Sequence, residues 1–169
     1  MERFSHGDSA ALDALFRRHS GAVHGYLQRL TGSGTLAEDL VQQTFVSLVR
    51  GRGRFVRGAK FKPWLYAIAT NAARDAHRRG KFERVSDDGT VGAKETVEPI
   101  ERDAGLARQV HAALAQLPGA QREAIVLHRF EGLSFGEIAE VTGLSESAVK
   151  VRAHRGYEKL RELLRGVWS

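Results

Sequence analysis

Residues 133–165, LSFGEIAEVTGLSESAVKVRAHRGYEKLRELLR, have the pattern of two helices joined by a glycine turn. Ser134, followed three residues later by Glu137, forms a capping box that predicts the start of a short helix. Gly143 is expected to end that helix, and Ser145 is expected to cap the next one. The stretch therefore predicts a helix-turn-helix, which makes nucleic-acid binding the first function to consider.

The second of these helices has an apolar side and a basic side. At roughly 100° per residue, one arc of this helix faces partner helices and carries Val149, Ala153, Tyr157, Leu160, Leu163 and Leu164. The opposite side has residue types that contact bases and phosphates in the major groove, although a solvated basic helix that only closes a bundle is the alternative. Val151 favours the DNA-binding interpretation. An apolar β-branched residue on the basic side is poorly explained by packing, whereas it could contact a thymine methyl. The predicted contact residues are Ser147, Lys150, Val151, Arg152, His154 and Arg155.

The composition narrows the class of protein. With 169 residues, 42% of them hydrophobic, the chain suffices for one ordinary domain or two small ones. It has no apolar run long enough to span a bilayer and no signal-peptide segment, so we expect a cytoplasmic protein without membrane insertion. The absence of cysteine excludes disulfides and thiolate metal sites, and the seven histidines lack ligand spacing. We therefore expect no metal site and no cofactor.

The positive charge is unevenly distributed. The net charge is +6; residues 1–80 are strongly basic, residues 81–105 are acidic, and residues 106–169 are weakly basic. Lysine and arginine gain affinity for nucleic acids by releasing counterions from phosphates. Two basic ends separated by an acidic middle therefore suggest two nucleic-acid surfaces.

Helical periodicity dominates the chain, and no pair of alternating β runs with a hairpin turn occurs, so the predicted fold class is all-α. We expect two small helical lobes, of which the first comprises residues 1–80. Asp8 is expected to cap its first helix, and Phe16 is expected to face inward. The helices predicted for this lobe lie near residues 9–31, 36–50 and 63–79.

The second lobe follows a segment of different composition. Residues 81–103 lose the helical periodicity and gain glycine, aspartate, glutamate and proline, which is typical of a flexible tether. The second lobe, residues 104–169, is expected to pack helices near 104–116 and 118–131 against the helix-turn-helix.

A narrow polar strip follows the helix predicted near 36–50. Thr35 and Glu38 are expected to form a capping box at its start, and most of its other side chains form a broad apolar arc. A solvent-exposed face more often consists of lysine and glutamate, whereas amides beside one acid suit hydrogen bonding to a partner protein. The two interpretations carry equal weight from the residues alone. The strip consists of Asp39, Gln42, Gln43 and Arg50.

The third predicted helix and the loop before it have the residues of a single-strand binding surface. The loop, RGRGRFVRGAKFK at 50–62, mixes glycines and basic residues with Phe55 and Phe61. Basic side chains hold phosphates and aromatic rings stack on unpaired bases, although the two phenylalanines have an even chance of folding back onto the core. The side of the helix expected to be exposed carries Tyr66, Thr70, Asn71, Arg74, His77 and Arg78.

Three segments resemble one protein family. AEDLVQQTFVSLVR at 37–50 resembles the polymerase-binding helix of bacterial sigma factors, and FKPWLYAIATNAARDAHRR at 61–79 resembles their promoter-melting helix. Residues 113–163 resemble the region that reads the minus-thirty-five element. Their order and the short linker are typical of the small extracytoplasmic-function group. This resemblance implies a non-enzymatic initiation factor whose partners are core RNA polymerase, promoter DNA and an anti-sigma factor.

The resemblance also implies roles for individual residues. Asp39, Gln42 and Gln43 would bind the clamp helices of the polymerase beta-prime subunit. Asn71 and the loop before the third helix would capture a flipped base, while Trp64 and Tyr66 would support strand opening. His128 and Arg152 would make phosphate contacts near the minus-thirty-five element. The residues implied at the minus-ten element are Arg57, Lys60, Phe61, Trp64, Tyr66, Asn71, Arg74 and Arg78.

Two other classes of protein fit the sequence less well. A response regulator with a helix-turn-helix output domain would share the motif at 132–152, but residues 1–100 lack the alternating strands and helices of a receiver. The sequence does not support an enzyme, because it has no glycine-rich phosphate loop and no cluster of histidine and carboxylate residues.

Overall fold

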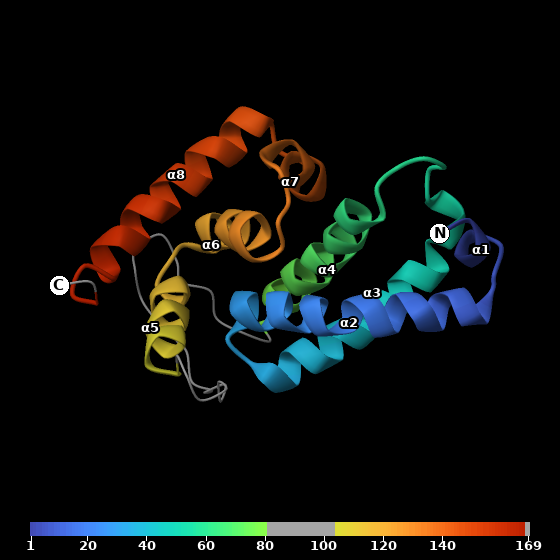
Figure 1. Ribbon diagram of the computed structural model, residues 1–169, viewed down its shortest axis with the longest axis horizontal. Coiled ribbons are helices and arrows are strands. Elements are labelled where there is room, and N and C mark those ends of the chain that lie inside the picture. The colour runs from blue at the N-terminus through green and yellow to red at the C-terminus, as the bar shows by residue number, and fades with distance from the viewer. Residues whose placement is uncertain (81–103, 168–169) are drawn as a thin grey trace.

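The computed structural model describes residues 1–80 and 104–167, and every regular element within these ranges is helical, which confirms the all-α class (Figure 1). The expected tether, residues 81–103, lies outside the described residues. The elements are α1 (Glu2–Ser5), α2 (Ser9–Thr31), α3 (Gly34–Arg50), the 3-10 turn η1 (Arg52–Arg54), α4 (Phe61–Arg78), α5 (Ala104–Ala115), α6 (Gly119–Ile125), the π-helical segment η2 (Val126–Phe130), α7 (Phe135–Thr142) and α8 (Glu146–Leu163).

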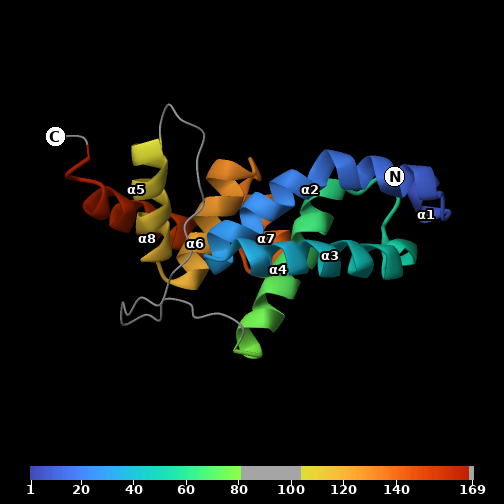
Figure 2. The same cartoon turned by 90° about the horizontal axis from the view of Figure 1, so that it is seen from below.

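Helices α2, α3 and α4 form the first lobe and pack around leucine and alanine side chains (Figures 1 and 2). Tyr26 and Tyr66 meet edge to face with ring centroids 5.1 Å apart. The Tyr26 hydroxyl lies 2.7 Å from the Thr70 hydroxyl, so a buried polar pair joins α2 to α4. Helix α4 is thereby fixed against α2 from within the core.

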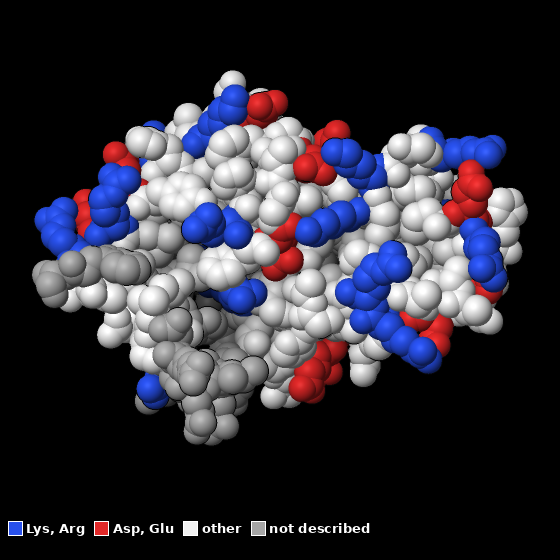
Figure 3. All heavy atoms as spheres, in the orientation of Figure 1, with Lys and Arg blue, Asp and Glu red and all other residues white. Residues whose placement is uncertain are grey.

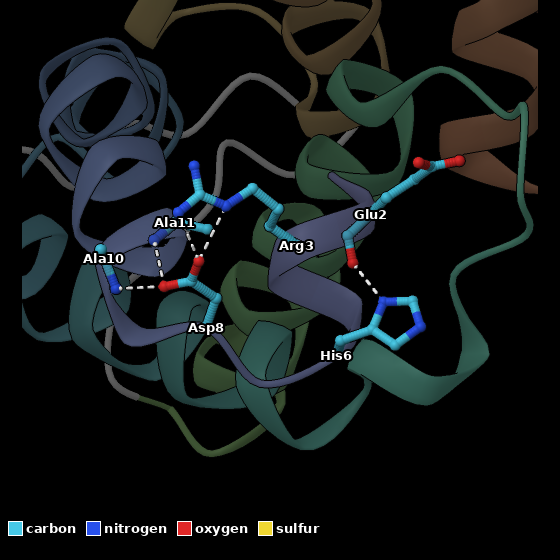
Figure 4. A network of polar contacts seen from close by, with 6 residues as sticks. All are labelled: Glu2, Arg3, His6, Asp8, Ala10 and Ala11. Atoms are coloured by element: carbon cyan, nitrogen blue, oxygen red, sulfur yellow. Dashed lines mark hydrogen bonds and ion pairs between the residues drawn. The ribbon is translucent and has the colours of Figure 1, made fainter.

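A short N-terminal helix, α1, precedes the three helices expected from the sequence. Its four residues are too few to show periodicity, yet Phe4 is fully buried. Asp8 follows it and caps α2 as predicted, since its carboxylate accepts from the backbone N–H groups of Ala10 and Ala11 (Figure 4). The N–H of Ala11 lowers the pKa of Asp8, and Arg3 adds an ion pair at 2.8 Å.

The start of α3 differs from the prediction. The helix begins at Gly34, and its cap is Ser33 rather than Thr35. The Ser33 hydroxyl accepts from the backbone N–H of Leu36, while Ser33 itself has an extended backbone. A serine two residues earlier therefore caps the helix in place of the expected capping box of Thr35 and Glu38.

The helix-turn-helix forms as the sequence predicts. Ser134 and Glu137 make the reciprocal capping box at 3.0 and 3.1 Å, and Gly143 ends α7 with a φ of 73°. Ser145 caps α8 through the N–H of Ala148 at 3.1 Å. The helix predicted near 118–131 is a shorter α6 followed by the π-helical η2, which widens the turn before α7.

Close packing between α6 and α8 gives a test of the second lobe's core. A Cβ at Gly156 of α8 would lie 2.5 Å from Cδ1 of Ile125, so we expect Gly156→Ala to lower the free energy of unfolding by about 1–2 kcal/mol. Gly21 of α2 has no atom within 4 Å of the corresponding position, and Gly21→Ala should raise the free energy of unfolding by about 0.5–1 kcal/mol. Denaturant unfolding measures both, and equal gains in stability would contradict the tight packing at Gly156.

Candidate nucleic-acid interface

Helix α8 presents its basic side to solvent. Val149 and Ala153 are buried against the lobe, whereas Val151 is 48% exposed. Lys150 and His154 lie near carboxylates of their own helix, 3.1 Å from Glu146 and 3.3 Å from Glu158 respectively. Of the predicted contact residues, Arg152 is half-buried and the others are exposed, namely Ser147, Lys150, Val151, His154 and Arg155.

His128 has a defined position beside the helix-turn-helix. Its Nδ1 lies 2.9 Å from the backbone oxygen of Leu133, and its ring stacks on Phe135 with centroids 4.3 Å apart. These contacts hold the half-buried ring at the turn that leads into α7. The predicted phosphate contact of His128 is not tested by this geometry and stays a prediction.

The polar strip of α3 is exposed except at Gln43, which is half-buried. Gln42 and Arg50 also border an open groove of about 900 Å³ between α2 and α3. Phe16, expected to face inward, is 42% exposed at this groove and meets Phe45 edge to face, with ring centroids 4.9 Å apart. That expectation was wrong because Phe16 lines the open groove between α2 and α3 instead of the closed core. The apolar side chains of the groove are Leu12, Phe16, Phe45, Val46 and Val49.

The loop before α4 folds back on its aromatic residues. Phe55 and Phe61 are half-buried and lie 5.0 and 6.1 Å from the Trp64 ring, between ring centroids. His19 packs on Phe61 at 5.1 Å, and burial lowers the pKa of this histidine. Of the two alternatives for the phenylalanines, the structure shows packing. Arg57 is exposed and forms an ion pair with Glu2 at 3.0 Å.

The exposed side of α4 is narrower than the sequence predicts. Asn71 and Arg78 are exposed, but Tyr66 is only 1% exposed and Thr70 is fully buried. The expectation for these two residues was wrong because Thr70 bonds to Tyr26 and the second lobe covers Tyr66. The helical periodicity of one segment cannot predict burial by a segment that is distant in the sequence.

The two lobes meet where α7 and the end of η2 approach α4 (Figure 1). The Tyr66 hydroxyl donates to the Glu131 carboxylate at 2.5 Å, and Lys62 donates to the backbone oxygen of Glu131. Burial raises the pKa of Glu131 and that of the Tyr66 hydroxyl. Buried apolar residues of both lobes belong to one continuous cluster.

Further contacts between the lobes are two ion pairs and one cation–π contact. Arg74 of α4 binds Glu123 of α6 at 2.6 Å, and this carboxylate is almost fully buried. Lys60 lies 3.7 Å from Glu137 at the start of α7. The Arg29 guanidinium lies over the Phe130 ring, 4.3 Å from its centroid.

Arg122 of α6 is a structural centre that sequence reasoning missed. It is 4% exposed, and its guanidinium donates to four backbone oxygens. Three acceptors lie at the end of α5 and the following turn, while the fourth, Leu30, lies in α2 of the first lobe at 2.9 Å. The sequence carries no signal for this residue, because its partners are backbone atoms. The acceptors are Leu114, Ala115, Leu117 and Leu30.

Comparisons with known proteins agree with this arrangement. The family model of sigma-70 region 2 matches residues 15–83, and that of sigma-70 region 4 matches residues 107–160. The RNA polymerase sigma factor CarQ of Myxococcus xanthus is 48% identical over 166 residues, which cover 97% of this chain and 95% of CarQ. The match of the N-terminal half to region 2 removes the response-regulator alternative.

Two solved structures share the fold. The sigma factor RpoE, in complex with the anti-sigma factor NepR from Bartonella quintana, is 27% identical with a TM-score of 0.79, covering 90% of this chain and 96% of that one. CnrH, in complex with the cytosolic domain of CnrY, is 30% identical with a TM-score of 0.75, covering 98% of this chain and 94% of that one.

The fold and the matches define a DNA-binding transcription factor. The chain belongs to the extracytoplasmic-function group of RNA polymerase sigma factors. It is thus an alternative sigma factor that directs RNA polymerase to promoters. None of the helices within residues 1–80 and 104–167 has the length and apolar content that a membrane crossing requires.

Proposed function

We propose that the two lobes divide promoter recognition between them. The second lobe, residues 104–169, reads the minus-thirty-five element with α8, and the first lobe, residues 1–80, binds polymerase and opens the minus-ten element. The observation that carries this proposal is the exposed basic side of α8 around Val151, on a helix whose opposite side is anchored in the core. The sigma factor itself makes and breaks no covalent bond, because nucleotide addition belongs to the polymerase.

The minus-ten surface of this proposal lies on α4 and the loop before it. The exposed Asn71 would hydrogen-bond an unpaired base, and the exposed Lys60 and Arg78 would supply positive charge for the strand. Phe61 and Trp64 are half-buried and stiffen the loop that presents these groups. The proposed set is Arg57, Lys60, Phe61, Trp64, Tyr66, Asn71, Arg74 and Arg78.

The polymerase surface is the exposed strip of α3, with Asp39, Gln42 and Gln43 as contacts to the beta-prime clamp helices. We propose that the sigma factor acts in the cytoplasm, because core polymerase is located there. We also propose an anti-sigma partner, because the related sigma factor RpoE was solved in complex with the anti-sigma factor NepR. The high TM-scores of both solved relatives over nearly the whole chain imply that both lobes superpose together, in the arrangement seen here.

Replacement of Lys150 tests the recognition helix. We expect Lys150→Ala to weaken holoenzyme binding to promoter duplex by about 1–3 kcal/mol, because one base or phosphate contact in the major groove is lost. The affinity for core polymerase should not change. Binding of both is measured by fluorescence anisotropy with the reconstituted holoenzyme.

Lys159→Ala is the matched control for this experiment, since Lys159 is exposed on the same helix but lies more than two turns after Lys150. It should leave duplex binding unchanged. Equal losses for the two variants, or a parallel loss of polymerase affinity in Lys150→Ala, would contradict the assignment of α8 to the minus-thirty-five element.

A further inference from the structure

Glu146 lies in the first turn of α8, directly after the cap Ser145, and is not among the predicted contact residues of this helix. Its Oε1 lies 3.1 Å from the Nζ of Lys150, and the side chains of Glu146 and Lys150 are 54% and 57% exposed. In the view of Figure 3, acidic and basic side chains lie next to each other over the end of α8 that follows α7. A recognition helix contacts base edges with its N-terminal residues. This helix therefore presents an acceptor and a donor together at its reading end.

The Glu146 carboxylate also lies beside α7. A Cβ at Gly136 would be 3.5 Å from its Oε2, which is an ordinary van der Waals distance. One oxygen thus faces the Lys150 ammonium, and the other lies next to the first turn of α7. Because the carboxylate has neighbours in both helices of the helix-turn-helix, the motif itself positions it beside Lys150.

A carboxylate on a DNA-binding helix needs a partner in the groove, because the phosphates repel it. Folding accounts for Glu146 only in part: an acidic residue in the first turn interacts favourably with the helix dipole, but an ion pair as exposed as this one contributes little to stability. In the major groove the base that a carboxylate suits best is cytosine, whose N4 amino group donates a hydrogen bond. The chemistry of Glu146 therefore matches cytosine.

The spacing of the two charged groups matches the edge of a G·C base pair. Within the pair, the cytosine N4 amino group donates to guanine O6, so these two atoms lie about 2.9 Å apart. The separation of 3.1 Å between Oε1 of Glu146 and Nζ of Lys150 is close to that value. Guanine also offers N7 beside O6, which gives the ammonium two acceptors, whereas an A·T pair has a single acceptor on either side of its amino group. The acceptor and donor of the protein are thus complementary to the donor and acceptors of G·C.

Lys150 can hold Glu146 and a base at the same time. An ammonium group has three N–H donors, of which one is directed at Glu146. Two remain for guanine O6 and N7. The carboxylate likewise has two oxygens, each with more than one acceptor position, so its contact with Lys150 leaves it able to accept from cytosine.

We propose that Glu146 and Lys150 read one G·C base pair of the minus-thirty-five element as a unit. Glu146 accepts a hydrogen bond from cytosine N4, and Lys150 donates to guanine O6 and N7. Glu146 is then a specificity-determining residue: at the cytosine position it excludes thymine, whose O4 would face another acceptor. This role rests on the proposed assignment of α8 to the minus-thirty-five element.

The base-pair preferences of E146A and E146Q test this role. The probes are labelled duplexes of a promoter from which the holoenzyme initiates, with each upstream base pair changed in turn to the other three. Holoenzyme with the unmodified chain should prefer G·C over A·T at one base pair by about five- to a hundred-fold. Both variants should reduce that preference by about five-fold or more, because E146A removes the acceptor and E146Q adds a donor that suits adenine. Fluorescence anisotropy measures the affinities.

The matched control is E162Q, which removes a carboxylate that is exposed on the same helix and paired with Lys159, about four turns after Glu146. It should keep every base-pair preference. Loss of the G·C preference in the Glu146 variants alone supports the proposed role. A uniform loss of affinity with unchanged preferences is what a purely structural glutamate would give, and it overturns the proposed role.

Removal of the cytosine amino group isolates the hydrogen bond to Glu146. The probe is the same duplex with 2-pyrimidinone, which lacks that amino group, in place of the cytosine. Holoenzyme with the unmodified chain should bind this duplex about five-fold or more weakly than the parent duplex, whereas holoenzyme with E146A should lose less. Equal losses for the two holoenzymes overturn the contact.

Lys150→Ala separates a failure of this role from a failure of the function on which it rests. If Lys150→Ala weakens duplex binding while the Glu146 variants keep the G·C preference, α8 still reads the element and only the role of Glu146 is overturned. If neither Lys150→Ala nor E146A changes affinity or preference, the assignment of α8 is overturned as well.

Discussion

Arg122→Ala is expected to lower the free energy of unfolding by about 3–4 kcal/mol, because it leaves four backbone oxygens near the end of α5 and in α2 without their donor. Desolvated acceptors of this kind cost more than the hydrogen bonds themselves contribute. Denaturant unfolding monitored by circular dichroism measures the loss. Because Leu30 is one of the acceptors, the contact between the lobes should loosen as well.

Arg129→Ala is the control for this variant, since Arg129 follows Arg122 by two turns and is exposed. Its effect on unfolding should stay within about 0.5 kcal/mol. A loss for Arg122→Ala no larger than that of Arg129→Ala would show that the four hydrogen bonds do not hold the second lobe together.

Asp39→Arg is expected to weaken association with core polymerase by about ten- to a hundred-fold, as reversal of a charge at a contact costs about 1.4–3 kcal/mol. The side chain is exposed on α3, so the fold should tolerate the change. Binding of the variant to duplex through α8 should not change. Association is measured by titrating labelled sigma factor with core polymerase.

Glu38→Arg provides the matched control, with the same change of charge one residue earlier on α3. Its side chain is exposed but points about 100° away from that of Asp39. We expect a smaller loss of polymerase affinity for Glu38→Arg. If Asp39→Arg binds polymerase as the unmodified chain does, the polar strip has another role.

Local sequence signals predicted most of the helices and their caps. Asp8, Ser134, Gly143 and Ser145 act as expected because each forms hydrogen bonds, or adopts a backbone conformation, within its own turn. The prediction was wrong where two such signals compete, as Ser33 caps α3 in place of Thr35. The short α1 was also not predicted, because four residues are too few to show a helical periodicity.

Side-chain exposure could be predicted only where no distant segment intervenes. The basic side of α8 is exposed as expected except at Arg152, which is half-buried. Tyr66 and Arg74 of α4 instead meet Glu131 and Glu123, which lie 65 and 49 residues further along the chain. No periodicity links positions so far apart, and the placement of the lobes was therefore not readable from the sequence.

The most direct test of the account is transcription from genomic DNA by core polymerase, with and without the purified chain, followed by sequencing of transcript 5′ ends. We expect a set of new start sites that share two sequence elements upstream at constant spacing, one for each lobe. Lys150→Ala should lose these starts, whereas Lys159→Ala should keep them. Absence of any new start site, or starts that share no upstream element, would contradict the account.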